Sequence, residues 1–153
     1  RLGAGRLFVL EGDEYPAAND DPRSKFLFYA PRHLLLTSGE HDHVNVFPTL
    51  ESYLDPFRQL VALVPDHGRI VACADGAHLH GVLDAARATV TRYARAPHPD
   101  ADWWAEDVAF GETTRFTLVH RGATVAALRT RLLGEHNVEN VVGVAALLLG
   151  GGW

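Results

Sequence analysis

The sequence predicts an α/β fold in which a mainly parallel sheet is flanked by helices and followed by a small antiparallel meander. Three short apolar runs, at residues 6–10, 34–36 and 69–74, are bounded by breakers or charged residues and have the length of buried strands. Helical patterns follow the second and third runs, and strands that alternate with helices are typical of parallel sheets with right-handed crossovers. From about residue 90 to 132 the pattern changes to short alternating strands, which indicates antiparallel pairing.

The composition fits one globular domain and argues against several classes of protein. The chain has 153 residues, of which 47% are hydrophobic and 22% charged, so it can form a core. Its net charge is −5 and no basic stripe occurs, which argues against a nucleic-acid partner. No apolar span or signal peptide points to a membrane, and the single cysteine, Cys73, fits a reducing cytoplasmic location.

The first predicted strand, residues 6–10, ends in the acidic segment 11–14. Glu11 would therefore stand at the carboxyl end of a strand, where open α/β sheets bind their ligands. The next segment, residues 15–31, contains three prolines and is predicted to be irregular. Within it, residues 23–29 combine two cations with aromatic side chains. They could contact an anionic substrate or form a loop pinned by its aromatics, and the composition favours the loop.

The second predicted strand, residues 34–36, leads into the polar cluster 40–43. Two imidazoles and two carboxylates in this position make a candidate metal or phosphate site, although a solvated loop rich in histidine has the same composition. His41 and His43 are two residues apart and would face the same way in an extended segment, where they could share one Zn²⁺. A hydrolase of this kind needs a third ligand, from Glu11 or a distant histidine, and no further zinc-binding spacing occurs.

Two helices are predicted between the second strand and the meander. Apolar residues recur every three or four positions from residue 50 to 64, and Thr49 can cap the start of this helix. Pro56 lies inside the pattern, so a kink or a break is expected there. After the strand 69–74, Asp75 is expected to cap a shorter helix.

The antiparallel meander is predicted to contain strands at residues 90–95, 114–120 and 124–132. A tight turn at residues 121–122 would join the last two of them.

The last helix is expected to begin within residues 134–140, with Asn137 as its N-cap. Asn137 and Asn140 are three residues apart and would project near the same end of the helix. A side-chain amide offers a donor and an acceptor together, which is the pair that reads an adenine edge. The two residues alone favour a simpler explanation, a cap and a solvated asparagine.

Three motifs, in this order, resemble the central ATPase domain of the Mur ligases: residues 11–15, residues 40–43 and residues 134–140. Residues 23–32 and 46–48 are similar to the murein peptide ligase branch of that family. The resemblance covers nearly the whole chain. It implies a Rossmann-like, partial central domain over residues 1–153, without the phosphate-binding loop and without the family's amino-terminal and carboxyl-terminal domains.

The resemblance also implies roles for five residues. Glu11 would coordinate a Mg²⁺ that bridges the phosphates of ATP, and His43 would bind a second Mg²⁺. These two residues are the candidate catalytic and metal-binding positions. His136, Asn137 and Asn140 would contact the adenine of ATP. Because Mg²⁺ prefers oxygen ligands, the metal role of His43 rests on the resemblance and not on coordination chemistry.

The activity implied by the resemblance is an ATP-dependent ligation in peptidoglycan recycling. ATP would phosphorylate the lactyl carboxylate of UDP-N-acetylmuramate to an acyl phosphate, which the amine of L-alanyl-γ-D-glutamyl-meso-diaminopimelate would then attack. We expect the full-length parent to catalyse this reaction in the cytoplasm, with ATP and Mg²⁺ as cofactors. We expect the fragment alone to be inactive and to bind ATP weakly or not at all.

Several residues near the expected metal site depart from the usual Mur ligase pattern. These departures leave a non-catalytic nucleotide-binding or scaffold domain as an alternative function. The residues that differ are Gly12, Pro16, Ser38, Gly39 and Asn45.

Overall fold

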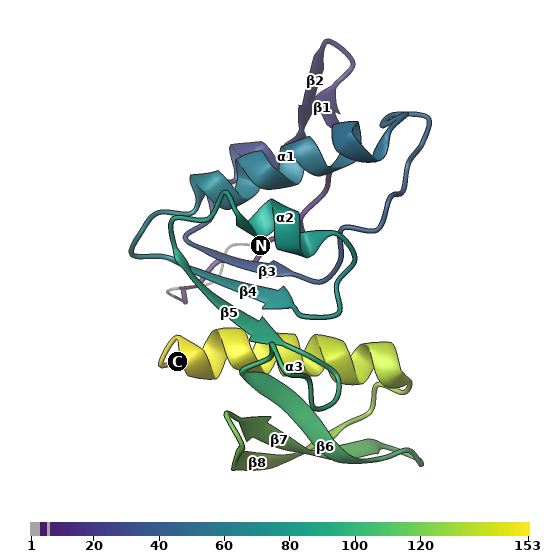
Figure 1. The fold of residues 1–153 in the computed structure, drawn as a ribbon, viewed down its shortest axis with the longest axis vertical. Coiled ribbons are helices and arrows are strands. Elements are labelled where there is room, and N and C mark those ends of the chain that lie inside the picture. The colour runs from purple at the N-terminus through teal and green to yellow at the C-terminus, as the bar shows by residue number, and fades with distance from the viewer. Residues whose placement is uncertain (1–3, 6) are drawn as a thin grey trace.

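The computed structural model describes residues 4–5 and 7–153, and within them helices pack on a six-stranded sheet while a separate two-stranded hairpin projects at one end of the molecule (Figure 1). The strands of the large sheet follow one another in chain order, from β3 to β8. The elements are β1 (Pro16–Ala18), β2 (Asp21–Ser24), the 3₁₀ helix η1 (Lys25–Phe28), β3 (His33–Leu36), α1 (Leu50–Leu63), β4 (Arg69–Cys73), α2 (Leu79–Leu83), β5 (Thr89–Tyr93), β6 (Trp103–Ala109), β7 (Thr114–His120), β8 (Ala123–Thr130) and α3 (Glu135–Gly150).

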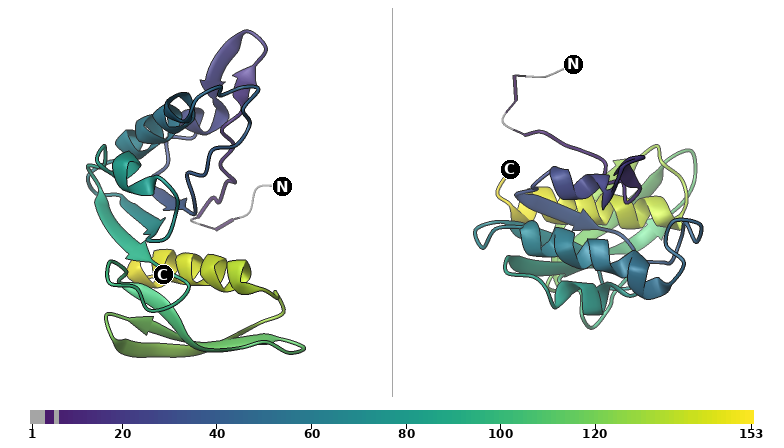
Figure 2. Two further views of the ribbon diagram at one scale, coloured as in Figure 1. Left: turned by 45° about the vertical axis from the view of Figure 1, so that its right-hand side comes forward. Right: turned by 90° about the horizontal axis from the view of Figure 1, so that it is seen from above.

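The parallel part of the sheet is covered on both faces, which explains its continuous apolar strands. β3, β4 and β5 pair in parallel, and β5 also pairs with β6 at a single position, Tyr93 with Trp103. Helix α3 packs against β3, β4, β5 and β6, while α1 and α2 pack against each other on the opposite side of the sheet (Figure 2). Four of the five residues of β4, from Ile70 to Cys73, are buried as a result.

The first apolar run is not a strand, contrary to the sequence prediction. Arg6 lies outside the described residues, and residues 7–10 have no regular secondary structure and exposed side chains. The expected parallel pairing with residues 34–36 is absent, so that β3 is the edge of the six-stranded sheet in the described part of the chain. An apolar run becomes a buried strand only where another strand and a covering layer meet it, and residues 7–10 meet neither.

The predicted cap of helix α1 is confirmed, and of the kink or break expected at Pro56 the break does not occur. The Thr49 side chain accepts a hydrogen bond from the backbone N–H of Ser52 at 3.1 Å, and the Ser52 hydroxyl accepts one from the N–H of Thr49 at 3.1 Å. The helix runs through Pro56 without interruption. The cap expected for the next helix is wrong, because α2 begins after His78, in the left-handed region, and not at Asp75.

The structure contains an antiparallel meander of β6, β7 and β8, which confirms the two predicted strands at residues 114–120 and 124–132, whereas β6 was not predicted as a strand. The predicted strand at residues 90–95 corresponds to β5, which belongs to the parallel part instead. The two-residue turn between β7 and β8 is also confirmed: Arg121 and Gly122 both have positive φ, at 50° and 80°, as the favoured hairpin turn requires.

Helix α3 begins two residues earlier than Asn137, the residue predicted to cap it. Gly134 occupies the N-cap position with φ of 94°, a value that glycine adopts without steric cost. Asn137 therefore lies within the first turn, and the N-cap prediction is wrong. On the sheet side of the helix, Val138 and Val142 are fully buried. None of the described helices combines the length and the hydropathy needed to cross a membrane.

Candidate active-site residues

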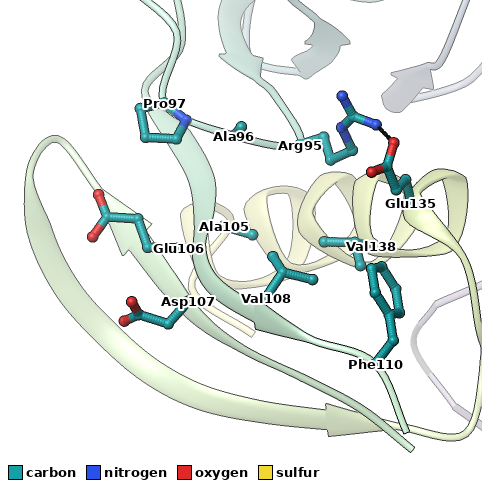
Figure 3. Close-up of a pocket in the computed structure, with 10 residues that line it drawn as sticks. All are labelled: Arg95, Ala96, Pro97, Ala105, Glu106, Asp107, Val108, Phe110, Glu135 and Val138. Carbon is teal, nitrogen blue, oxygen red and sulfur yellow. Dashed lines mark hydrogen bonds and ion pairs between the residues drawn. The ribbon is translucent and has the colours of Figure 1, made fainter.

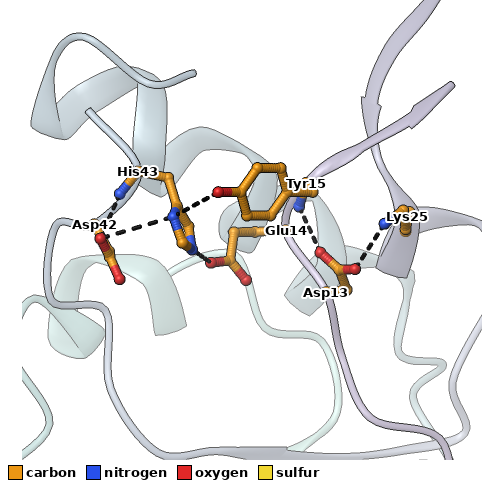
Figure 4. Close-up of polar contacts among 6 residues, drawn as sticks. All are labelled: Asp13, Glu14, Tyr15, Lys25, Asp42 and His43. Atoms are coloured by element: carbon orange, nitrogen blue, oxygen red, sulfur yellow. Dashed lines mark hydrogen bonds and ion pairs between the residues drawn. The ribbon is translucent and has the colours of Figure 1, made fainter. Parts of the chain in front are cut away.

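The loop after β3 brings His43 against the segment that precedes β1 (Figure 4). Nε2 of His43 lies 2.9 Å from Oε1 of Glu14, and Nδ1 lies 3.0 Å from the hydroxyl of Tyr15. The imidazole also packs on the Tyr15 ring, with 4.4 Å between the ring centroids. An oxygen of Asp42 approaches Nδ1 only to 3.7 Å, which is beyond hydrogen-bonding distance. Both ring nitrogens of His43 therefore have a defined partner.

The backbone of His43 is held in the left-handed region, with φ of 54°. This conformation costs a non-glycine residue about 1 kcal/mol or more and persists where the surroundings enforce it. The Asp42 carboxylate accepts a hydrogen bond from the backbone N–H of His43 at 2.6 Å. The backbone carbonyl of His43 accepts hydrogen bonds from the N–H groups of Val46 and Phe47 at 2.7 and 2.9 Å. These three bonds fix the turn that directs the ring toward Glu14.

His41 contacts residues that stabilise the loop and α1, whereas His43 contacts the segment at residues 14–15. Nε2 of His41 lies 2.8 Å from the carbonyl oxygen of Phe47, and the His41 ring packs near Tyr53, with 5.5 Å between the centroids. The two histidines thus turn to different partners. No group of three or more His, Cys, Asp or Glu side chains that could hold a metal ion occurs among the described residues. The geometry does not meet what the zinc hydrolase alternative requires.

Glu11 does not contact His43, because residues 7–10 do not form the strand that was expected to place it. Its side chain is exposed, and it forms no hydrogen bond or ion pair within the described part of the chain. The expected geometry, with Glu11 and His43 on adjacent strand ends, is therefore wrong. The carboxylate that meets His43 belongs to Glu14, three residues further on. Sequence reasoning missed Glu14 and Tyr15 as partners, although both lie in the motif at residues 11–15.

The cations of residues 23–29 bind neighbouring carboxylates. Nζ of Lys25 lies 2.8 Å from an oxygen of Asp13, and this hydrogen bond holds the pKa of Asp13 below its usual value. Arg23 pairs with Asp21 at 2.6 Å and lowers the pKa of that carboxyl group to about 2. The Arg23 guanidinium also lies 4.5 Å from the centre of the Phe28 ring. These contacts agree with a segment pinned by its own side chains, but the prediction of an irregular loop is wrong, because the segment forms β1, β2 and η1.

An excess of carboxylates surrounds the His43 loop. Burial raises the pKa of Tyr53 to about 12, and the negative charges of Glu14, Asp42 and Glu40 add to the shift. Carboxylate oxygens are the ligands that Mg²⁺ prefers, and their charge favours a bound cation. This charge favours a cation electrostatically, but the described residues near His43 do not by themselves complete a metal site, because no group of three or more suitable side chains occurs among them.

The three candidate adenine contacts at the start of α3 remain at the surface. His136 and Asn140 are exposed, and Asn137 is half-buried. The Asn137 amide donates to the carbonyl of Leu133 at 2.7 Å, and its nitrogen also lies 3.0 Å from Nε2 of His136. One donor of this amide is therefore used locally, while its carbonyl oxygen forms no hydrogen bond with any described residue.

A hollow of about 560 Å³ lies between β6 and the first turn of α3 (Figure 3). Val108, Phe110 and Val138 line its apolar side, and an ion pair between Arg95 and Glu135 closes one end. The three candidate adenine contacts at the start of α3 do not line this hollow, and neither do the residues of the His43 loop. We therefore do not assign this hollow to the nucleotide.

The fold and the His43 loop together define the class of the chain: an α/β domain with a parallel sheet, an antiparallel extension and a histidine–carboxylate contact beyond the edge strand. A family model described as "Mur ligase middle domain" matches residues 4–148. The chain belongs to the Mur ligase family, and the match confirms the resemblance deduced from its three motifs.

Individual relatives point to one branch of this family. The ligase from Haemophilus influenzae named UDP-N-acetylmuramate–L-alanyl-γ-D-glutamyl-meso-2,6-diaminoheptandioate ligase is 28% identical over 142 residues, which cover 93% of this chain and 30% of the relative. The Escherichia coli ligase of the same name is 31% identical over 139 residues, which cover 91% of this chain and 30% of that ligase. The crystal structure of the corresponding ligase from Neisseria meningitidis aligns with a TM-score of 0.79 and 31% identity, covering 94% of this chain and 43% of that one. The chain thus spans about a third of the length of these curated relatives.

Proposed function

We propose that the chain is part of the central domain of an ATP-dependent ligase that forms an amide bond in peptidoglycan recycling. The substrates would be UDP-N-acetylmuramate and the tripeptide L-alanyl-γ-D-glutamyl-meso-diaminopimelate, which the names of the relatives contain. The observation that carries the proposal is the position of His43. It follows the edge strand of the parallel sheet and pairs with a carboxylate of the motif at residues 11–15.

In this reaction the chain contributes mainly binding and positioning. ATP phosphorylates the carboxylate of the UDP-sugar, the amine of the tripeptide attacks the resulting acyl phosphate, and phosphate leaves. Mg²⁺, when bound, neutralises charge on the phosphates. Glu11 and His43 would hold the metal ions, and the start of α3 would contact adenine through His136, Asn137 and Asn140. The proposed enzyme acts in the cytoplasm.

The test compares two variants in the complete ligase, that is, this chain together with the remaining domains of its relatives. Glu11→Ala should abolish turnover, because it removes a charge that holds Mg²⁺ on the transferring phosphate. His41→Ala should reduce turnover much less, because His41 contacts the Phe47 carbonyl and not the site. Phosphate release, measured with both substrates and ATP, reports the result.

Two outcomes would count against the proposal. A larger loss for His41→Ala than for Glu11→Ala would contradict the assignment of the site. A wild-type protein that binds ATP and Mg²⁺ but releases no phosphate would favour the non-catalytic nucleotide-binding or scaffold alternative, which the departures at Gly12, Pro16 and Asn45 keep open.

A further inference from the structure

We propose that Arg95 and Glu135 bind the free amino-acid end of the diaminopimelate residue of the tripeptide, and that the hollow beside them takes its methylene groups. The inference rests on the proposed function, which makes this tripeptide a substrate. It concerns two residues to which the sequence assigned no role, and it makes them determinants of which peptide the enzyme accepts.

The chemistry of the substrate decides which groups a site must offer. Diaminopimelate is the 2,6-diaminoheptandioate in the names of the relatives, a short methylene chain with an amino and a carboxyl group at each end. One amino group forms the bond to D-glutamate, so the other end of the chain keeps a free ammonium and a free carboxylate. A complementary site therefore needs a cation, an anion and an apolar wall next to them.

The hollow between β6 and α3 offers the apolar wall, with a volume of about 560 Å³. Phe110 and Val108 are 51% and 38% exposed, so their apolar surface is free to be covered by a ligand. The pairing register of β6 shifts between Glu106 and Ala109, and Asp107 has a positive φ of 54°. Val108 consequently points toward α3, whereas Asp107 points away from it (Figure 3).

Arg95 and Glu135 supply the two charges at one end of the hollow. Arg95 lies two residues beyond the carboxyl end of β5, and Glu135 is the first residue of α3. Their side chains form an ion pair and are 44% and 66% exposed. Exposed ion pairs contribute little stability, so the two side chains can exchange each other for the groups of a ligand at small cost. The guanidinium would bind the free carboxylate through two N–H groups, and Glu135 would bind the free ammonium.

The tripeptide is long enough to connect the hollow with the His43 loop. Both lie at the carboxyl edge of the parallel strands, the loop after β3 and the hollow beyond β5 and beside β6. Three strand spacings, from β3 to β6, amount to about 14 Å. About thirteen bonds separate the reacting amine of L-alanine from the free end of diaminopimelate, or roughly 15 Å in an extended chain. The amine can therefore react near the His43 loop while the far end of the peptide occupies the hollow.

Two peptides that differ by one carboxylate test the inference in the complete ligase. L-Lysine in place of diaminopimelate removes only the free carboxylate and keeps the ammonium. Arg95→Gln should raise KM for the diaminopimelate peptide by about 10- to 100-fold, should keep kcat within about twofold, and should leave KM for the lysine peptide unchanged. Glu135→Gln should raise KM for both peptides, because both carry the ammonium. Arg58→Gln is the matched control: it breaks an ion pair with Glu51 on α1 and should change neither KM.

A binding measurement separates this inference from the proposed function. Calorimetry of the diaminopimelate peptide with the complete ligase, UDP-N-acetylmuramate and a non-hydrolysable ATP analogue needs no turnover. Wild-type binding that weakens by about 10- to 100-fold in Arg95→Gln, in a protein that releases no phosphate from ATP, would support the inference and refute the proposed function. Ligation of both peptides by Arg95→Gln with wild-type KM values would overturn the inference and leave the proposed function intact. An equal rise in KM for the two peptides would also overturn it, because Arg95 would not then act through the free carboxylate. A wild-type enzyme that binds neither peptide would overturn both.

Discussion

The ring of Tyr93 lies directly against the backbone of Gly143. A Cβ atom built on Gly143 would lie 2.7 Å from Cζ of Tyr93 and 3.1 Å from a methyl carbon of Leu35. Tyr93 is fully buried at the end of β5, so its ring has no free space to move into. Helix α3 can therefore approach the sheet this closely only because residue 143 has no side chain.

Gly143→Ala should destabilise the chain by about 1–3 kcal/mol, because overpacking a well-filled core forces side chains or backbone to shift. Urea unfolding followed by circular dichroism measures the change. Gly81→Ala is the matched control. Gly81 lies in α2 with no atom within 4 Å of a built Cβ, so alanine there should be neutral or stabilising by about 0.5–1 kcal/mol. Equal stabilities for Gly143→Ala and the wild type would contradict the close approach.

Raised tyrosine pKa values should make the protein lose stability in alkaline solution. The pKa of Tyr53 is raised from 10.0 to about 12, first by burial and then by nearby carboxylates. The unfolded chain releases this phenolic proton at the lower pH, so the contribution is complete below pH 10 and is lost as the pH rises toward 12. The effect of this one residue is up to about 3 kcal/mol. Burial also raises the pKa of Tyr93, which adds to the same slope.

The free energy of unfolding, measured by urea titration between pH 9 and 12, should fall less steeply for Tyr53→Phe than for the wild type. Tyr29→Phe, which changes an exposed tyrosine, is the control and should keep the wild-type slope. A Tyr53→Phe curve parallel to the wild-type curve would show that the Tyr53 phenol does not contribute.

The two predicted helix caps, Thr49 for α1 and Asn137 for α3, can be compared by mutation. Thr49→Ala removes half of a capping box and should cost about 1 kcal/mol of stability. Asn137→Ala should cost less, because Asn137 lies inside the first turn of α3 and its side chain accepts no hydrogen bond from a backbone N–H of the described residues. Chemical unfolding of both variants measures the difference. A larger loss for Asn137→Ala would indicate that its side chain does cap the helix.

Local patterns were sufficient for the elements whose neighbours lie close in sequence. The cap at Thr49 and the turn at residues 121–122 each depend on a few adjacent residues, and the sequence predicted both of them. The cap of α3 was missed because Gly134 acts through its backbone, with φ of 94°, whereas Asn137 has the more familiar capping side chain.

Features that depend on distant parts of the chain could not be predicted in the same way. Residues 7–10 have the composition of a buried strand, but strand formation requires a partner and a covering layer that the local sequence does not specify. The strand β5 alternates like an antiparallel strand, yet it pairs in parallel with β4. His43 was singled out by the resemblance to the Mur ligases, whereas its contacts with Glu14 and Tyr15 depend on how two loops meet.

The exposed apolar segment and the open sheet edge predict self-association of the isolated chain. Phe8 is 70% exposed and Val9 is 89% exposed, and β3 has no strand paired beside it among the described residues. Unpaired edges and exposed apolar runs favour contacts between molecules. Light scattering should therefore show an apparent mass that rises with protein concentration. Val9→Lys should reduce this rise, because a charge disfavours burial in such a contact, whereas Val144→Lys on the exposed side of α3 is the control. A wild-type chain whose mass stays constant with concentration would contradict the prediction, and equal effects of the two lysines would place the contact elsewhere.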